Sequence, residues 1–137
     1  MVVVYAEGGN YRIELDQSTA YCRVWSRPDV DSQAGASFAL EKIAHFQALA
    51  RGQAERMILD LMDAPPVAGP KTQEALGAML ASWEAARRPI ALVVGDNKVQ
   101  LLQLKRLTVS HAPHYGRVFS DLDLARDWLS TLQQGDA

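Results

Sequence analysis

The residues best suited to binding chemistry lie between Asp63 and Thr72, in a segment rich in proline and glycine. Asp63 supplies a carboxylate, Lys71 an ammonium group and Thr72 a hydroxyl, where a short apolar strand gives way to a helix. Open α/β sheets tend to bind ligands beyond the carboxyl ends of their strands, and the free amides at a helix start attract anions. We therefore interpret Asp63, Gly69, Lys71 and Thr72 as a candidate site for a partner protein or an anion.

This segment differs from a nucleotide-binding P-loop, because Pro70 precedes Lys71 and the required earlier glycine is missing. The consecutive prolines at 65–66 make the loop stiff, and its low conformational entropy favours a fixed recognition surface. The alternative is that the prolines and glycines only shape the turn.

Two histidines, His111 and His114, lie three residues apart and could ligate a metal ion or assist Ser110 as a nucleophile. A metal site needs a third and usually a fourth ligand, Pro113 disfavours a regular helix through the pair, and no nucleophile-elbow motif is present. We interpret both histidines as surface or hinge residues. The single cysteine, Cys22, lies in a strand-like run with no base identifiable beside it, so we interpret it as a core residue.

Composition restricts the class of protein. The chain has 14 basic and 16 acidic residues, which are interspersed, so we expect no nucleic-acid partner. The basic pairs Arg87-Arg88 and Lys105-Arg106 each lie near the end of a predicted helix, where cations complement the helix dipole. No apolar run is long enough to span a membrane, no signal peptide is recognisable, and one cysteine fits a reducing cytoplasm. We expect a cytoplasmic protein that needs neither a metal nor a cofactor.

The elements that must position these residues follow from hydrophobic periodicity. Three strands separated by turn signals form an antiparallel meander, at 2–6, 11–15 and 20–25. Nearly all-apolar strands then alternate with helices, which we expect at about 32–50, 70–87, 99–107 and 120–132. The order β-β-β-α-β-α-β-α-β-α predicts an α/β fold: a mixed sheet with antiparallel N-terminal strands, C-terminal βαβαβα units and about four helices. We expect a single domain over 1–132 and a frayed tail over 133–137.

Each helix is expected to bury one apolar stripe. The stripe of the first helix is predicted to contain Leu40, with His45 facing solvent. The third helix is predicted to face inward through Val99, Leu102 and Leu107, and Leu101 and Leu104 broaden this face. We expect Trp83 and Trp128 to pack in the core, and Ser120 and Asp123 to form a capping box at the start of the last helix. Asp60 lies in an apolar strand, and we expect it to find amide or hydroxyl partners in the loop that follows this strand.

This order of elements resembles the STAS family, named after sulfate transporters and anti-sigma-factor antagonists. The closest local likeness is Ile58-Leu59-Asp60-Leu61, similar to the family's Leu-Asp-Leu strand, which leads through a short loop to Asp-Ser-Ser-Gly at a helix start. The strand at 89–95 and the closing strand at 118–120 also look like their counterparts, and the likeness spans about 11–132. It implies a bacterial regulatory domain that is not an enzyme and binds a protein partner.

One departure from the family pattern concerns regulation. Counting forward from Leu59, the family's Asp-Ser pair falls on Ala68 and Gly69. In the family that serine is phosphorylated, which switches binding off. Gly69 has no hydroxyl, so this switch cannot operate at this position. Thr72 is more simply a first-turn residue that bonds a backbone amide.

Three hypotheses remain open. The first is a non-enzymatic interaction domain that recognises an unidentified protein partner through the loop and helix from Asp63 to Leu80, and a homodimer is compatible with it. The second is a small-molecule or lipid-binding module of the STAS/CRAL-TRIO-like type. The third is an enzyme that uses the histidine segment.

Overall fold

Strands form where the sequence alternates polar and apolar residues or runs apolar without a break. The computed structural model describes residues 2–27, 29, 32–64 and 70–135, leaving aside the side chains of 32–39, 70–72 and 133–135. The strands of the meander are β1 (Val2–Gly8), β2 (Tyr11–Asp16) and β3 (Thr19–Trp25). The later strands are β4 (Arg56–Asp63), β5 (Ile90–Val93) and β6 (Gly116–Phe119).

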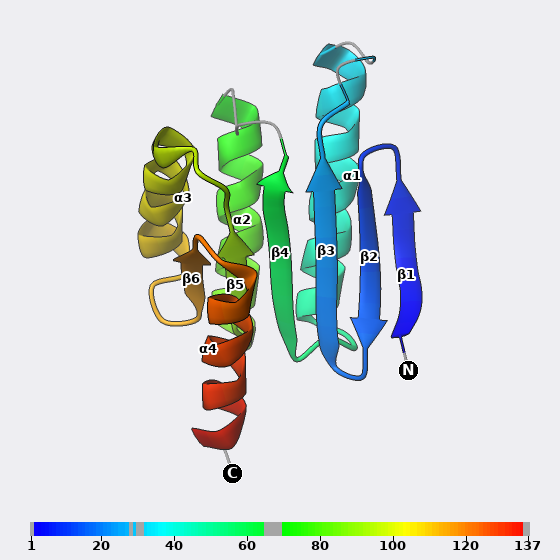
Figure 1. Cartoon of the computed structure of the whole chain (residues 1–137). Coiled ribbons are helices and arrows are strands. Elements are labelled where there is room, and N and C mark those ends of the chain that lie inside the picture. Colours follow the sequence, from blue (N-terminus) through cyan, green and yellow to red (C-terminus); the bar gives the residue numbers. More distant parts are fainter. Residues whose placement is uncertain (1, 28, 30–31, 65–69, 136–137) are drawn as a thin grey trace.

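Helices connect the later strands and close the described chain. They are α1 (Ser32–Ala50), α2 (Pro70–Ala86), α3 (Lys98–His111) and α4 (Leu122–Gly135). The strands form one six-stranded sheet whose spatial order, β1 to β6, is also their order along the chain (Figure 1). Pairing is antiparallel from β1 to β3 and parallel from β3 to β6. The predicted fold class, a mixed α/β sheet with an antiparallel front, is confirmed.

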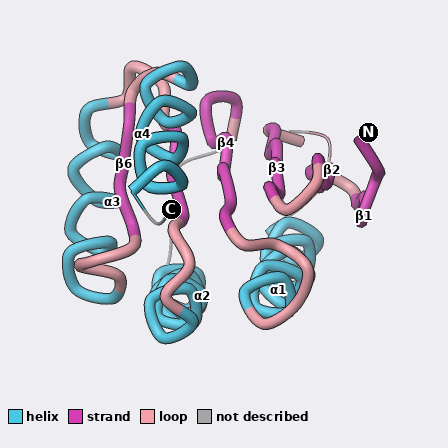
Figure 2. The backbone as a smooth tube through the Cα atoms, turned by 90° about the horizontal axis from the view of Figure 1, so that it is seen from below, coloured by secondary structure: helices cyan, strands magenta, loops and turns pink. Residues whose placement is uncertain are grey.

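The helices cover the two faces of the sheet unequally. Because each connection leads to the next strand in the same direction, crossovers of one hand place their helices on one face. The helices α1 and α2 cover that face, α3 packs beside α2 at the β6 end, and α4 lies on the opposite face (Figure 2). Among the described residues, α4 is the only helix on that second face, where it contacts β4, β5 and β6. The second face of β1, β2 and β3 is therefore open.

Rows of side chains cross the open face, because β2, β3 and β4 pair directly opposite one another. Residues two apart on a strand point to the same face, so the rows alternate with core residues. The rows are Asp16, Thr19 and Arg56; then Glu14, Tyr21 and Ile58; then Arg12, Arg23 and Asp60. The open face thus carries an ordered set of charges and hydroxyls.

The main core lies between the sheet and the α1–α3 layer. Trp83 is fully buried there, and its Nε1 donates a hydrogen bond to the Phe46 carbonyl at 3.2 Å. Cys22 is also fully buried, as predicted, and burial raises the pKa of its thiol. A smaller cluster joins α4 to the second face of the sheet, with Trp128 packed against it.

Two predictions for α1 are wrong. Leu40 is 61% exposed, because it lies on a side of α1 that the sheet does not cover, whereas the next residues, Glu41 and Lys42, bond to Tyr11 and Asn10 of the meander. His45 packs against aromatic rings instead of facing solvent, with ring centroids 5.9 Å from Tyr5 and 6.0 Å from Tyr11. The meander extends over this flank of the helix and covers the histidine.

The cap of α4 is also displaced by one residue from its predicted position. Asp121, not Ser120, accepts the hydrogen bonds of the free amides, from Asp123 at 2.7 Å and Leu124 at 3.2 Å. Aspartate is among the preferred N-cap residues for this reason.

Arg88 has a role that spacing along one helix could not indicate. Its Nη1 donates to the carbonyls of Gly52 and Ala54 at 2.8 Å each, with the Leu49 carbonyl at 3.4 Å. These carbonyls lie at and just beyond the C-terminal end of α1, which carries partial negative charge. Arg88 therefore fastens the end of α1 to the turn between α2 and β5.

Candidate functional site

The predicted loop site is only partly described. Asp63 ends β4, is exposed, and pairs with Arg23 of β3, with 2.8 Å between Oδ2 and Nη2. Lys71 and Thr72 lie in the first turn of α2, but their side chains are outside the described residues, as is Gly69 as a whole. The structure thus joins Asp63 to a cation of the open sheet face. The proposal that these four residues form one site remains a prediction.

The two histidines contact different turns of α2. The His114 ring lies 2.7 Å from Glu84 Oε2, while Glu84 Oε1 accepts the amides of His114 at 3.0 Å and Tyr115 at 2.8 Å. Burial would raise the pKa of Glu84, but the Tyr115 amide and the His114 ring and amide together lower it. His111 instead lies against Gly77, where an added Cβ would stand 2.7 Å from Nε2.

Gly77 and Glu84 are seven residues apart, which corresponds to about 10 Å along a helix. The histidine segment therefore attaches the end of α3 to two separate points of α2. Within the described ranges, no group of three or more histidine, cysteine or acidic residues could hold a metal ion.

The outward face of α3 is the clearest departure from the predicted core. Val99 is 78% exposed and Leu102 is 51% exposed, although both were expected to face inward. The buried positions are Gln100, Leu104 and Thr108. The prediction is therefore wrong for Val99 and Leu102, whereas Leu101 and Leu107 pack against the core and Leu104 is fully buried.

Close packing at β6 explains this rotation of α3. A Cβ added to Gly116 would lie 2.8 Å from both Thr108 Cγ2 and Ala112 Cβ, so only small residues fit between α3 and β6. The Thr108 hydroxyl is satisfied within the helix, because it donates to the Leu104 carbonyl at 2.7 Å. A polar residue can thus take an inward position that periodicity would reserve for leucine.

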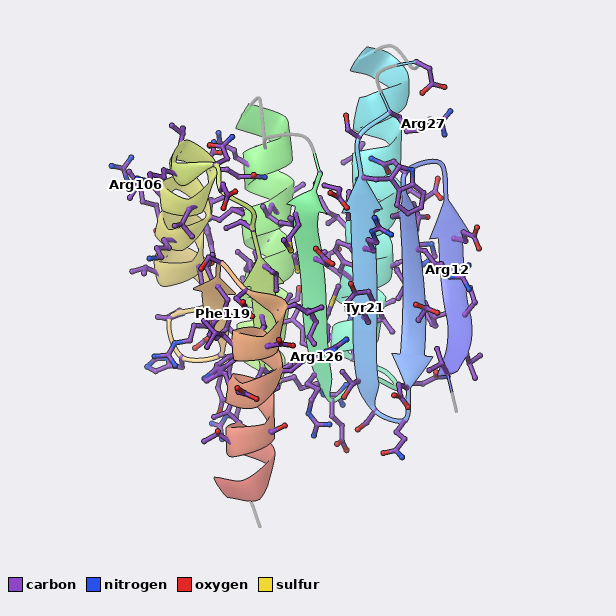
Figure 3. All side chains as sticks on the ribbon, viewed as in Figure 1. Arg12, Tyr21, Arg27, Arg106, Phe119 and Arg126 are labelled. Carbon is purple, nitrogen blue, oxygen red and sulfur yellow. The ribbon has the colours of Figure 1, made fainter. Side chains whose placement is uncertain are left out.

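We use the name α3 surface for Val99, Leu102, Arg106 and Val109. Their spacing of three, four and three residues places them on one stripe of the helix, and Val109 is 72% exposed. The helix also contains Lys98 and Lys105 but no acidic residue. A groove of about 450 Å³ runs beside this stripe, lined by Gln73 of α2 together with residues of α3. Arg106 points away from the body of the molecule (Figure 3).

A second groove, which we name the sheet groove, lies where α4 meets the open sheet face. Its volume is about 760 Å³. Tyr21 and Arg126 lie on this side of the molecule, Tyr21 on the sheet and Arg126 on α4 (Figure 3). The remaining lining residues come from β1, from the first two rows, from the turn after β2 and from α4. They are Val2, Glu14, Asp16, Gln17, Thr19, Arg56, Ile58, Leu129 and Ser130.

Tyr21 and Asp60 form a half-buried link beside this groove. The Tyr21 hydroxyl donates to Asp60 Oδ2 at 2.6 Å, and Asp60 Oδ1 accepts the Met62 amide at 3.1 Å. The prediction that Asp60 finds hydroxyl and amide partners is confirmed, but both lie in strands instead of the following loop, the hydroxyl in β3 and the amide in β4 itself. Burial, then the hydrogen bond and charge of Asp60, raise the pKa of Tyr21 to about 12, against the opposing charges of Arg126 and Arg23.

Comparisons with known proteins complete this description. In the described part of the chain, no helix has the length and hydropathy needed to cross a membrane. The chain matches no protein-family model, no curated protein and no solved structure.

Proposed function

We propose that this chain is a non-enzymatic, STAS-like interaction domain that binds an acidic, amphipathic helix of a partner protein through the α3 surface. The observation that carries this proposal is the stripe of exposed apolar side chains on α3. Soluble proteins rarely leave neighbouring large apolar residues uncovered without a binding role. A helix laid along such a stripe would present its own apolar residues at the same spacing.

The charge of α3 supports an acidic partner. Lys98, Lys105 and Arg106 flank or interrupt the apolar stripe, and the helix has no carboxylate to offset them. A second copy of the chain would place cation against cation here. An acidic helix would meet complementary charge, which favours rapid and selective association.

The apolar area implies a modest affinity. Covering the exposed parts of Val99, Leu102 and Val109 would contribute on the order of 3–6 kcal/mol. Association costs a comparable amount in lost translational and rotational freedom. The ion pairs and the rest of the groove must supply the surplus, as expected for a reversible regulatory contact.

The groove beside the α3 surface reaches the first turns of α2, the helix that follows the loop singled out by the family resemblance. Gln73 lines the groove and follows Lys71 and Thr72 in the first turns of α2. A partner helix on the α3 surface would thus lie next to the predicted segment from Asp63 to Leu80. With Gly69 in place of the family's serine, occupancy would depend on partner concentration instead of phosphorylation at that position.

The test uses a synthetic helical peptide with leucines at heptad spacing and glutamates elsewhere, and a matched peptide in which lysines replace the glutamates. We expect fluorescence anisotropy to show binding of the acidic peptide alone, weakened about tenfold or more by Leu102→Glu. Leu124→Glu is the matched control, because Leu124 is 54% exposed on α4.

A second measurement uses the natural partner. A photo-crosslinking residue at position 102, introduced in the source cell, should give a discrete adduct that the same residue at position 124 does not give. Equal peptide binding by the two glutamate variants, together with no adduct specific to position 102, would contradict the proposal.

A further inference from the structure

Two arginines, Arg56 and Arg126, and two carboxylates, Glu14 and Asp16, line the sheet groove. Glu14 Oε2 lies 3.7 Å from Arg12 Nη2, and Asp16 also has a partner. The guanidinium of Arg126, in contrast, forms no hydrogen bond or ion pair with any described residue. The charge of Arg126 is therefore the one in the groove that a bound anion could pair with directly.

Arg56 is held in place mainly by neutral groups. Its Nη1 lies 3.2 Å from Thr19 Oγ1 and 3.4 Å from Ser18 Oγ. Glu55, which is largely exposed, is 3.7 Å from Nη2. Yet the Arg56 side chain is only 14% exposed. An oxyanion in the groove could approach this largely buried cation more closely than Glu55 does and would stabilise it.

The rest of the lining suits an organic body. The Tyr21 side chain and the aliphatic side chains of Ile58 and Leu129 line the groove together with the hydroxyls of Thr19 and Ser130. Its volume of about 760 Å³ lies within the range of small-molecule sites. The groove is also on the other face of the sheet from α1 and α2, so it is independent of the α3 surface.

We propose that the sheet groove binds an organic oxyanion, a phosphate or carboxylate group attached to an aromatic or apolar body. The guanidinium groups of Arg56 and Arg126 bind the oxyanion, since planar guanidinium matches both phosphate and carboxylate oxygens. The Tyr21 ring, Ile58 and Leu129 contact the organic body. The hydroxyls of Thr19 and Ser130 offer further donors to the same oxygens.

The experiment is an NMR titration of the full, ¹⁵N-labelled chain with four probes: phenyl phosphate, benzoate, inorganic phosphate and phenol. Arg126→Gln is the test variant, since Arg126 is exposed and makes no contact needed for folding. Arg106→Gln removes the same charge from the α3 surface and serves as the control. Thermal unfolding of both variants checks that the fold is kept.

We expect phenyl phosphate or benzoate to give saturable shifts at the amides of Tyr21, Ile58 and Leu129, with inorganic phosphate weaker and phenol inactive. Arg126→Gln should weaken the tighter probe about tenfold, and Arg106→Gln should leave its affinity unchanged. A preference for phenyl phosphate identifies a phosphate ester as the ligand, and a preference for benzoate identifies a carboxylate.

Three results would overturn the proposal. They are the absence of saturable shifts in the groove with either organic anion, equal weakening by Arg126→Gln and Arg106→Gln, and binding of phenol as tight as that of phenyl phosphate. None of them bears on the α3 surface, because the peptide assay uses a different face and different variants.

Discussion

Replacing Arg88 with alanine should loosen the attachment between the end of α1 and the turn before β5. Two short charge-assisted hydrogen bonds are lost, to the carbonyls of Gly52 and Ala54. Water can replace the guanidinium at Gly52, which is exposed, but less readily at Ala54, which is fully buried. One full bond and part of a second correspond to about 2–3 kcal/mol.

The matched control is Arg87→Ala. Arg87 is exposed, and within the described residues its side chain forms no hydrogen bond or ion pair, so the change should stay within about 0.5 kcal/mol. Urea denaturation followed by tryptophan fluorescence measures both variants, because the buried Trp83 changes environment on unfolding. In thermal unfolding, the same loss of stability should lower the melting temperature of Arg88→Ala by roughly 6–12 °C.

Arg88→Lys separates charge from geometry. Lysine keeps the positive charge but cannot hold two carbonyls in a fixed fork, so we expect an intermediate loss. If Arg88→Ala loses no more stability than Arg87→Ala, the attribution of this role to Arg88 is wrong.

Three further predictions concern packing and titration. Gly77→Ala should gain about 0.5–1 kcal/mol of helix stability only when His111→Ala removes the ring that blocks the new Cβ, as urea denaturation of the single and double variants would show. The pKa of Tyr21 is raised from 10.0 to about 12. The protonated Tyr21 hydroxyl therefore stabilises the fold in full below pH 10, and this contribution is lost as the pH rises to 12. Tyr21→Phe should flatten that part of the unfolding free energy measured against pH, and an unchanged slope would contradict this. Burial lowers the pKa of Lys42 from 10.5 to about 8. The cost of burying its charged ammonium group therefore destabilises the fold in full below pH 8, and this cost disappears by pH 10.5. Lys42→Met should therefore compare more favourably with the wild type at pH 7 than at pH 10.5, and an equal difference at both would refute the assignment.

The order and type of the elements could be predicted because they depend on local patterns. Alternation marks the half-buried meander, and unbroken apolar runs such as the one at Ile90 mark strands covered by helices. The burial of Cys22 and Trp83 follows from the same patterns. Each of these predictions depends on residues that are close to one another in the sequence.

The features that were missed depend on contacts between distant segments. The rotation of α3 is fixed by Gly116 of β6, which admits only Thr108 and Ala112. The partners of Arg88 lie more than thirty residues earlier in the chain. The sheet groove likewise exists because four strands, β1 to β4, and α4 come together. Periodicity within one helix or strand carries no information about such neighbours.

The identical order of the strands in space and along the chain has a consequence for synthesis on the ribosome. Each new strand finds its pairing partner already made, so the sheet can grow at one edge as the polypeptide emerges. No strand among those described has to wait for a later one or be inserted between two others. We therefore expect nascent chains that end after β5 to have formed the meander and the α1 layer already.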